Sequence, residues 1–172
     1  LQYFKKKENE YKIIADKVYL SILLKSKEIT KDDFLNEVNF DSSFEIISII
    51  LIFYLKIFKN INTSKYKEIN NELVNNLIND LDKTLREIGI GDMSIGKYVK
   101  KYVKKFYYRI KIIDNILDNY EKDKFVAYLN SIKTVDNKNT GKLATELMII
   151  YEKIKKNPEN IKKNIYWFFK FI

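Results

Sequence analysis

The chain has 172 residues, of which 46% are hydrophobic, and it carries a formal net charge of +9 with neither cysteine nor histidine. These two absences exclude disulfides, zinc sites built from Cys and His, and Ser-His or Cys-His nucleophile pairs, and no carboxylates are spaced as in an EF-hand. We therefore expect a non-catalytic protein without cofactor or metal. Only four glycines and one proline occur, which favours long helices joined by short loops, so we expect one all-α domain over residues 1–172.

The first predicted helix covers residues 9–26, where apolar side chains recur at helical spacing. Thr30 and Asp33 have the spacing of a capping box, in which the side chains at the N-cap and at the third helical position satisfy each other's backbone N–H groups. This spacing predicts a second, short helix over residues 31–37.

The next predicted helix is the most apolar segment of the chain. Ser42 and Glu45 repeat the capping-box spacing directly before it, and the helix is predicted over residues 43–58. Its apolar run is too short for a typical membrane span. Because it is apolar on nearly every side, we expect it at the centre of an irregular bundle of about six to eight helices.

Two further helices are predicted around a glycine-containing loop. Apolar residues keep helical spacing over 67–88, and Gly89 follows where a left-handed C-cap is expected. Ser94 is predicted to N-cap a helix over residues 95–120. The Asp82 and Arg86 side chains, four residues apart, are expected to pair on one helical face.

The last part of the chain contains one more predicted helix and an aromatic end. After a polar loop at 133–141, a helix is expected over 143–156, and Pro158 separates it from the segment 159–172. Two interpretations of this aromatic segment stay open: a last helix that closes the core, and a contact with a membrane or another protein, since Trp and Tyr favour such boundaries.

The stretch from Asp80 to Lys101, DLDKTLREIGIGDMSIGKYVKK, resembles the signature of the ubiquinol–cytochrome c chaperone family. That signature continues through a basic helix to Phe-Tyr and an arginine, which are here Phe106, Tyr107 and Arg109. The family places glycine before this arginine, whereas the present chain has Tyr108.

The resemblance implies a non-catalytic chaperone that binds newly synthesised cytochrome b and promotes assembly of the cytochrome bc complex (respiratory complex III). The resemblance also implies that the protein acts near the ribosomal exit tunnel, where the mitochondrial relatives act with a small partner protein. DNA is not among the partners that it implies. The chain shows no signal-peptide pattern, so we expect that it is not secreted. The resemblance implies the bacterial cytoplasm near the inner membrane or the mitochondrial matrix. The residues that we assign to the motif and to client binding are Asp80, Asp82, Arg86, Glu87, Gly89, Gly91, Asp92 and Arg109.

The predicted helix 95–120 has one apolar face and one face of lysines. The lysines expected to dock on an acidic partner are Lys97, Lys100, Lys101 and Lys104. A solvated face over a core-packed helix is the alternative, since the lysine excess follows equally from a compositional bias of the genome. Gly91 is expected to allow a sharp turn, and the two arginines of the chain, Arg86 and Arg109, are either client contacts or internal struts. A basic RNA-binding module unrelated to cytochrome assembly is the second functional interpretation.

Overall fold

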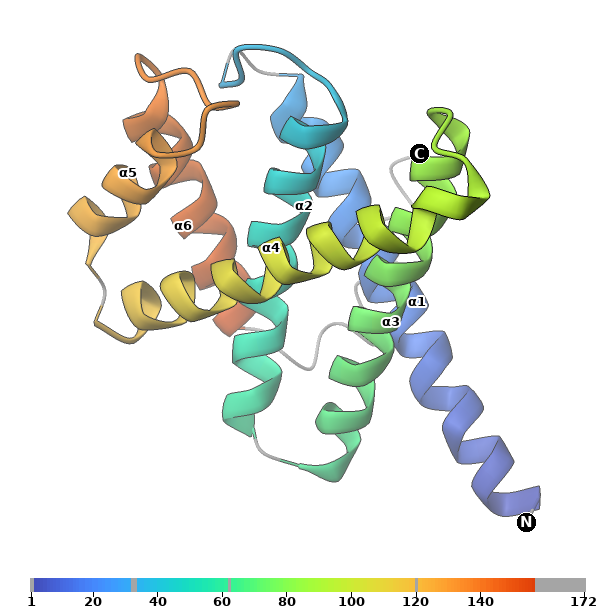
Figure 1. The fold of residues 1–172 in the computed structure, drawn as a ribbon. Coiled ribbons are helices and arrows are strands. Elements are labelled where there is room, and N and C mark those ends of the chain that lie inside the picture. The colour runs from blue at the N-terminus through green and yellow to red at the C-terminus, as the bar shows by residue number, and fades with distance from the viewer. Residues whose placement is uncertain (1, 32–33, 62, 120, 157–172) are drawn as a thin grey trace.

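The computed structural model describes residues 2–31, 34–61, 63–119 and 121–156, with side chains from Glu10 onwards. In this part of the chain it contains only helices as regular secondary structure, which confirms the all-α prediction (Figure 1). The helices are α1 (Gln2–Thr30), α2 (Phe40–Ile61), α3 (Ser64–Glu87), α4 (Asp92–Asn119), α5 (Lys122–Asn130) and α6 (Thr140–Lys156).

The predicted central helix is α2. It packs against α1, α3, α4 and α6, while α4 crosses it on the face nearest the viewer in Figure 1. Its aromatic side chains Phe53 and Phe58 are buried, and Phe53 meets Phe125 of α5 and Tyr151 of α6 at ring-centroid distances of 6.4 and 5.2 Å. A helix that is apolar on nearly every side thus finds partners on nearly every side.

The N-terminus of α2 differs from the prediction, because the helix begins at Phe40 rather than after Ser42. Asn39 is the residue that caps it. The Asn39 Oδ1 accepts a hydrogen bond from Ser42 N–H (3.0 Å), and Ser42 Oγ accepts one from Asn39 N–H (2.8 Å). This is a capping box one turn earlier than expected, and it leaves Glu45 inside the helix and buried.

The prediction of a short helix over residues 31–37 was wrong. Leu35 instead forms a β-bridge with Val135, and Asn36 N–H donates to the Thr134 carbonyl (3.0 Å). Asp136 N–H donates to the Phe34 carbonyl (2.9 Å). The loop before α2 therefore pairs with the loop before α6, and this long-range pairing replaces the local cap that the spacing had indicated.

Two elements late in the chain complete the bundle. The sequence left residues 122–130 unassigned, but they form α5, whose Phe125 and Leu129 are fully buried. The helix predicted over 143–156 is confirmed as α6, three residues longer at its start. The aromatic segment 159–172 lies outside the described residues.

Ion pairs that involve a buried side chain of α2 join α4 to α2 at two places. At the first, Lys56 of α2 is buried and lies 2.6 Å from Asp114 and 2.8 Å from Asp118 of α4. Burial lowers the pKa of Lys56, but hydrogen bonds to the two carboxylates outweigh it and the pKa is raised. The second place, at Arg109, belongs to the candidate site.

We expect the stability of the fold to fall at alkaline pH. Burial and a hydrogen bond to Asp41 raise the pKa of Tyr102 to about 12, and burial likewise raises the pKa of Tyr19 and Tyr128. Below the unfolded tyrosine pKa of about 10 both states keep the proton; above it the unfolded state releases the proton first, so stability is lost as pH rises from about 10 to 12 and beyond.

Urea unfolding at stepped pH, with tyrosinate absorbance followed in parallel, checks this expectation. Tyr102→Phe should make the alkaline decline less steep, whereas the exposed-site variant Tyr108→Phe should leave it unchanged. A decline that starts below about pH 9 would contradict the assignment to these tyrosines.

Candidate functional site on the α3–α4 hairpin

The hairpin between α3 and α4 carries most of the motif residues, and its turn is set by Gly89. Gly89 has φ +96°, a left-handed conformation, as predicted for the C-cap. Gly89 N–H donates to the Arg86 carbonyl and Ile90 N–H to the Leu85 carbonyl, both at 3.0 Å. This pattern is a Schellman motif, which satisfies the last carbonyls of α3 and stops the helix sharply.

Gly89→Ala is therefore expected to destabilise the protein by about 1–2 kcal/mol, because an alanine in the left-handed region brings its Cβ close to the backbone. Gly96 is the matched control, since it is exposed inside α4 and an added Cβ meets no atom within 4 Å. Gly96→Ala should stabilise by up to about 1 kcal/mol through helix propensity. Chemical unfolding of the two variants should shift in opposite directions.

Gly91 and Ser94 do not have the roles that the sequence suggested. The backbone of Gly91 is not left-handed, and a Cβ there would point into open space. Its carbonyl accepts hydrogen bonds from the N–H groups of Ser94 (2.9 Å) and Ile95 (3.1 Å). Gly91 is thus the residue before the first turn of α4, which begins at Asp92, and Ser94 already lies within the helix.

Arg86 bridges the two sides of the hairpin on its surface. Its Nε donates to Asp82 one turn earlier on α3 (2.7 Å), and its Nη1 donates to Asp92 at the start of α4. The Asp82–Arg86 pair was predicted; the additional contact with Asp92 was not. These hydrogen bonds raise the pKa of Arg86. One guanidinium thus links the end of α3 to the beginning of α4.

The remaining acidic residues of the motif have separate surroundings. Asp80 faces α1, where it accepts a hydrogen bond from the Tyr19 hydroxyl (2.9 Å). Glu87 is exposed at the end of α3 and lies 3.9 Å from Lys83. The structure therefore brings Asp82, Arg86 and Asp92 together and leaves Asp80 and Glu87 outside that group.

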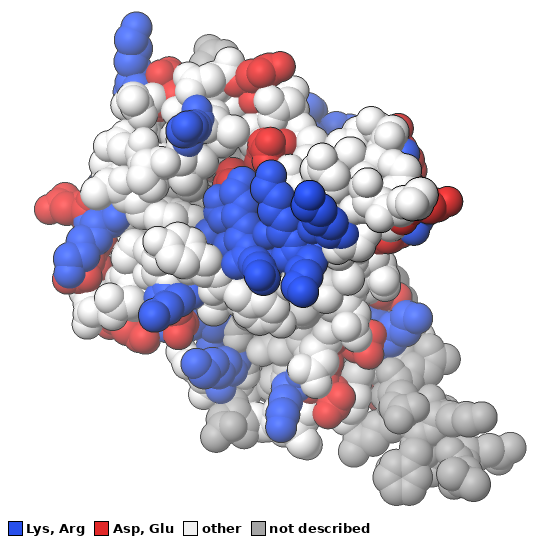
Figure 2. Space-filling model, in the orientation of Figure 1, with Lys and Arg blue, Asp and Glu red and all other residues white. Residues whose placement is uncertain are grey.

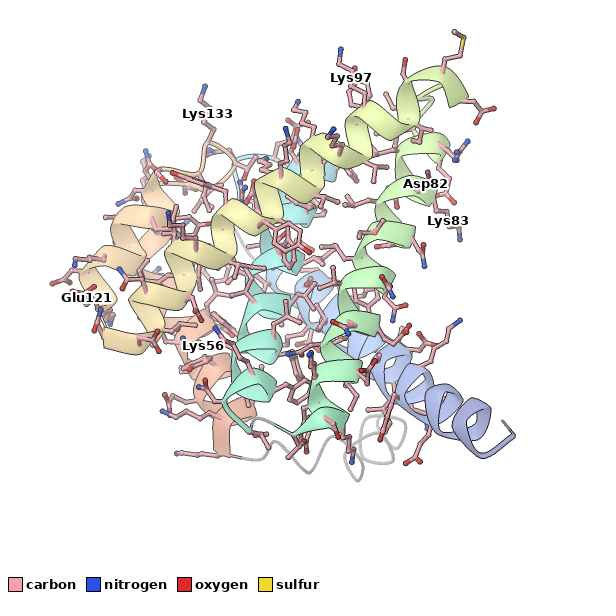
Figure 3. All side chains as sticks on the ribbon, turned by 60° about the horizontal axis from the view of Figure 1, so that its bottom comes forward. Lys56, Asp82, Lys83, Lys97, Glu121 and Lys133 are labelled. Atoms are coloured by element: carbon pink, nitrogen blue, oxygen red, sulfur yellow. The ribbon has the colours of Figure 1, made fainter. Side chains whose placement is uncertain are left out.

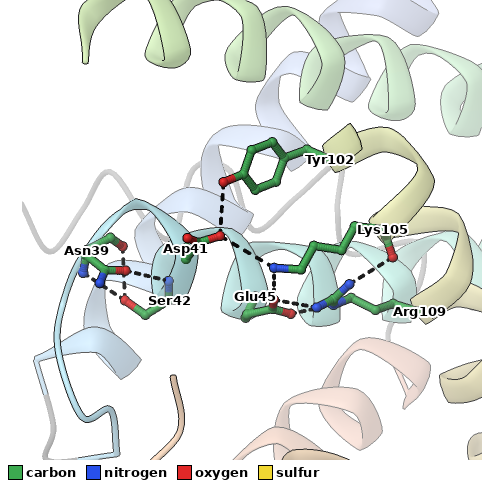
Figure 4. Close-up of polar contacts among 7 residues, drawn as sticks. All are labelled: Asn39, Asp41, Ser42, Glu45, Tyr102, Lys105 and Arg109. Carbon is green, nitrogen blue, oxygen red and sulfur yellow. Dashed lines mark hydrogen bonds and ion pairs between the residues drawn. The ribbon is translucent and has the colours of Figure 1, made fainter. Parts of the chain in front are cut away.

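Arg109 is an internal strut and lies away from the turn of the hairpin, in the middle of α4. Two nitrogens of its guanidinium donate to the carboxylate of Glu45, and a third donates to the Lys105 carbonyl (2.9 Å) (Figure 4). Lys105 Nζ lies 2.8 Å from Glu45 as well, and Asp41 accepts from the Tyr102 hydroxyl (3.1 Å). The sequence analysis did not identify Glu45 as the partner of Arg109, because the two residues are 64 positions apart.

The predicted lysine strip, Lys97, Lys100, Lys101 and Lys104, is exposed along the outer face of α4. Figure 2 shows the largest cluster of basic side chains on this face of the molecule where α4 crosses the front in Figure 1. Figure 3 shows Lys97 pointing away from the bundle. The apolar residues predicted to share the opposite face, Ile95, Tyr102, Phe106 and Ile113 among them, are buried.

The sequence analysis missed two exposed apolar residues beside the hairpin turn. Met93 is fully exposed and Ile88 is 57% exposed, one at the start of α4 and one at the end of α3. Ile88 had been assigned to the apolar stripe of the predicted helix 67–88, and Met93 lay before the predicted helix 95–120 and had no assigned role. The position of the turn leaves both side chains in solvent. We call Ile88, Gly89, Gly91 and Met93 the hairpin tip.

Two kinds of feature are absent from the described part of the chain. No group of three or more Cys, His, Asp or Glu side chains lies there as a possible metal site. Nor does any helix within the described ranges have the length and hydropathy required to cross a membrane. The fold and its surface thus define an all-helical protein whose prominent features are a basic helix face and an apolar hairpin tip, as in proteins that bind other macromolecules.

Comparison with known proteins identifies the class more narrowly. The family model of the ubiquinol–cytochrome C chaperone matches residues 32–147, more than half of the chain. The chain belongs to the ubiquinol–cytochrome c chaperone family, and this membership supports a non-enzymatic role as a chaperone in assembly of respiratory complex III.

A solved structure shares the fold. The crystal structure of the Cbp3 homolog from Brucella abortus superimposes with a TM-score of 0.75 and 21% sequence identity, over 90% of this chain and 87% of that one. A search among curated proteins gave no significant match.

Proposed function

We propose that the chain holds segments of newly synthesised cytochrome b during assembly of the cytochrome bc complex, and that the hairpin tip with the Asp82–Arg86–Asp92 bridge is the contact surface. The observation that carries this proposal is the exposure of Met93 and Ile88 on a hairpin whose geometry is fixed by a Schellman turn and a surface ion pair. Cytochrome b is a membrane protein, so its unassembled segments offer apolar surface for such a tip.

The other motif residues support this surface from a distance. Asp80 fixes α3 against α1, and Arg109 fixes α4 against α2. We assign them a positioning role and reserve client contact for the tip. The place of action that fits this client is the membrane containing the bc complex, on the cytoplasmic side in a bacterium or the matrix side in a mitochondrion.

Capture of tagged cytochrome b from cells tests the client surface. Gly91→Arg should lower recovery several-fold, because it adds a large cation at the tip while the open space around the Gly91 Cβ lets the fold persist. Gly141→Arg is the matched control, since an added Cβ at Gly141 also meets nothing within 4 Å and the residue lies on α6. Equal recovery with both variants would refute the tip as the client surface.

A second candidate function is RNA or ribosome binding through the lysine strip. The observation that favours it is the exposure of Tyr107 and Tyr108 next to Lys104, since aromatic side chains among lysines suit unpaired bases. If this is the principal function, ribosomes or RNA should be recovered in the same capture without cytochrome b, and binding should weaken steeply with salt.

A further inference from the structure

We propose that the outer face of α4 and the hairpin tip together bind the headgroup layer of an anionic lipid bilayer. This inference rests on the proposed function, because it names the partner of the lysine strip and places the client surface at the membrane. It concerns a reversible surface contact made by residues 88–111, separate from any contribution of the aromatic segment 159–172.

The first observation is the charge of this face. Between Asp92 and Asp114 the chain contains no acidic residue. Besides the four residues of the strip, Lys111 is exposed on α4, and none of these five lysines has an ion pair among the described residues. Lys105 differs from these five lysines, because it forms ion pairs with Asp41 and Glu45. A row of lysines about 21 Å long, from Lys97 to Lys111, therefore has no carboxylate partner among the described residues and is available to an anionic surface, although Lys101 also lies over the Tyr102 ring.

The second observation is that apolar side chains continue the same face. Met93 lies one turn before Lys97 on α4, so both project from the same side of the helix, and Ile88 lies just across the turn. Tyr107 and Tyr108, both more than half exposed, follow Lys104. Along α4, this face therefore carries first the apolar Met93, then the lysine strip and then two tyrosines. A lipid interface accommodates all three types of side chain.

A bilayer fits these observations better than RNA does. The two arginines of the chain are both engaged by carboxylates, Arg86 by Asp82 and Asp92 and Arg109 by Glu45, so no free guanidinium is left for bidentate contacts with phosphates or bases. Lysine supplies point charges that suit a diffuse field of headgroups. The aliphatic tip has no counterpart on an RNA surface, whereas insertion of Met93 and Ile88 between acyl chains removes them from water.

Co-sedimentation with vesicles tests the electrostatic part. The purified full chain should bind vesicles containing about one-third phosphatidylglycerol and not vesicles of phosphatidylcholine alone, and binding should weaken as salt rises. Lys97→Glu with Lys101→Glu should reduce binding at least about tenfold. Lys142→Glu with Lys153→Glu, the same charge change at two exposed residues of α6, should reduce it by less than about twofold.

The absence of cysteine from the chain makes the insertion part directly measurable. Met93→Cys, labelled with an environment-sensitive fluorophore, should brighten and shift to the blue on anionic vesicles. Ile149→Cys, at a half-exposed residue of α6, should not change.

Several results overturn the proposal: equal binding to neutral vesicles, equal loss with the two pairs of charge reversals, or binding of ribosomal RNA without binding of vesicles. The vesicle assay contains no cytochrome b, and client capture in detergent contains no bilayer. If the protein captures cytochrome b but does not bind vesicles, only the lipid-binding inference is refuted. If it binds vesicles but does not capture cytochrome b, only the proposed client is refuted.

Discussion

Arg109→Ala is expected to destabilise the protein by about 3–5 kcal/mol, the typical cost of removing one partner from a buried ion pair. Glu45 is almost completely buried, and Arg109 provides two of the hydrogen bonds to its carboxylate. Without the guanidinium, Lys105 is the one cation of the described residues that remains paired with the Glu45 carboxylate. The buried charge then loses most of the compensation for its removal from water.

Two controls separate this effect from the loss of a positive charge. Arg86→Ala removes an arginine that is equally paired but exposed on the hairpin, so its unfolding midpoint should move far less. The double variant Glu45→Leu with Arg109→Leu removes both buried charges and should be more stable than either single variant. Urea unfolding of the wild type, Arg109→Ala, Arg86→Ala, Glu45→Leu, Arg109→Leu and the double Leu variant measures all of these differences. Additive effects of Glu45→Leu and Arg109→Leu would contradict a coupled pair.

Phe53→Ala is expected to lower the free energy of unfolding by about 3–5 kcal/mol, as much as Arg109→Ala but for a different reason. Phe53 is fully buried on the central helix and contacts the aromatic rings of both α5 and α6. Its truncation leaves a cavity where three helices meet, and a rigid core cannot close such a space without strain.

Ile149→Ala provides the comparison for Phe53, since Ile149 is apolar, helical and half exposed on α6. It should change the unfolding free energy by less than about 0.5 kcal/mol. If the two variants unfold at similar denaturant concentrations, α2 is not the organising centre of this fold.

Capture of cytochrome b by these stability variants separates support from contact. Arg109→Ala should reduce capture only in proportion to the fraction of unfolded protein, because Arg109 is buried at the α2–α4 interface. Gly91→Arg should reduce capture without moving the unfolding midpoint of the protein by a comparable amount.

The helices α1, α2, α3, α4 and α6 could be predicted from the sequence because helical periodicity is a local property. Side chains three and four residues apart share a face whatever the rest of the chain does, so the apolar stripes marked the core and the lysines of α4 marked the outer face. The glycine in the left-handed turn, Gly89, was predictable for the same reason: its role depends on the few residues before it.

Partners far apart in the sequence could be found only in the tertiary structure. Capping-box spacing at Thr30 and Ser42 was misleading, because Asn39 caps α2 and the loop at residues 34–36 pairs with the loop at residues 134–136. The choice of Glu45 as the partner of Arg109 likewise depends on how α4 crosses α2.

The sequence by itself therefore determined the helical class, the central helix and the two-sided character of α4, since each follows from side-chain spacing within one segment. Tertiary structure decided which charges are buried struts and which are free, and it decided that Ile88 and Met93 face solvent. The physical reason is that burial and ion pairing are set by the neighbouring segment in space, and a periodic pattern does not specify that neighbour.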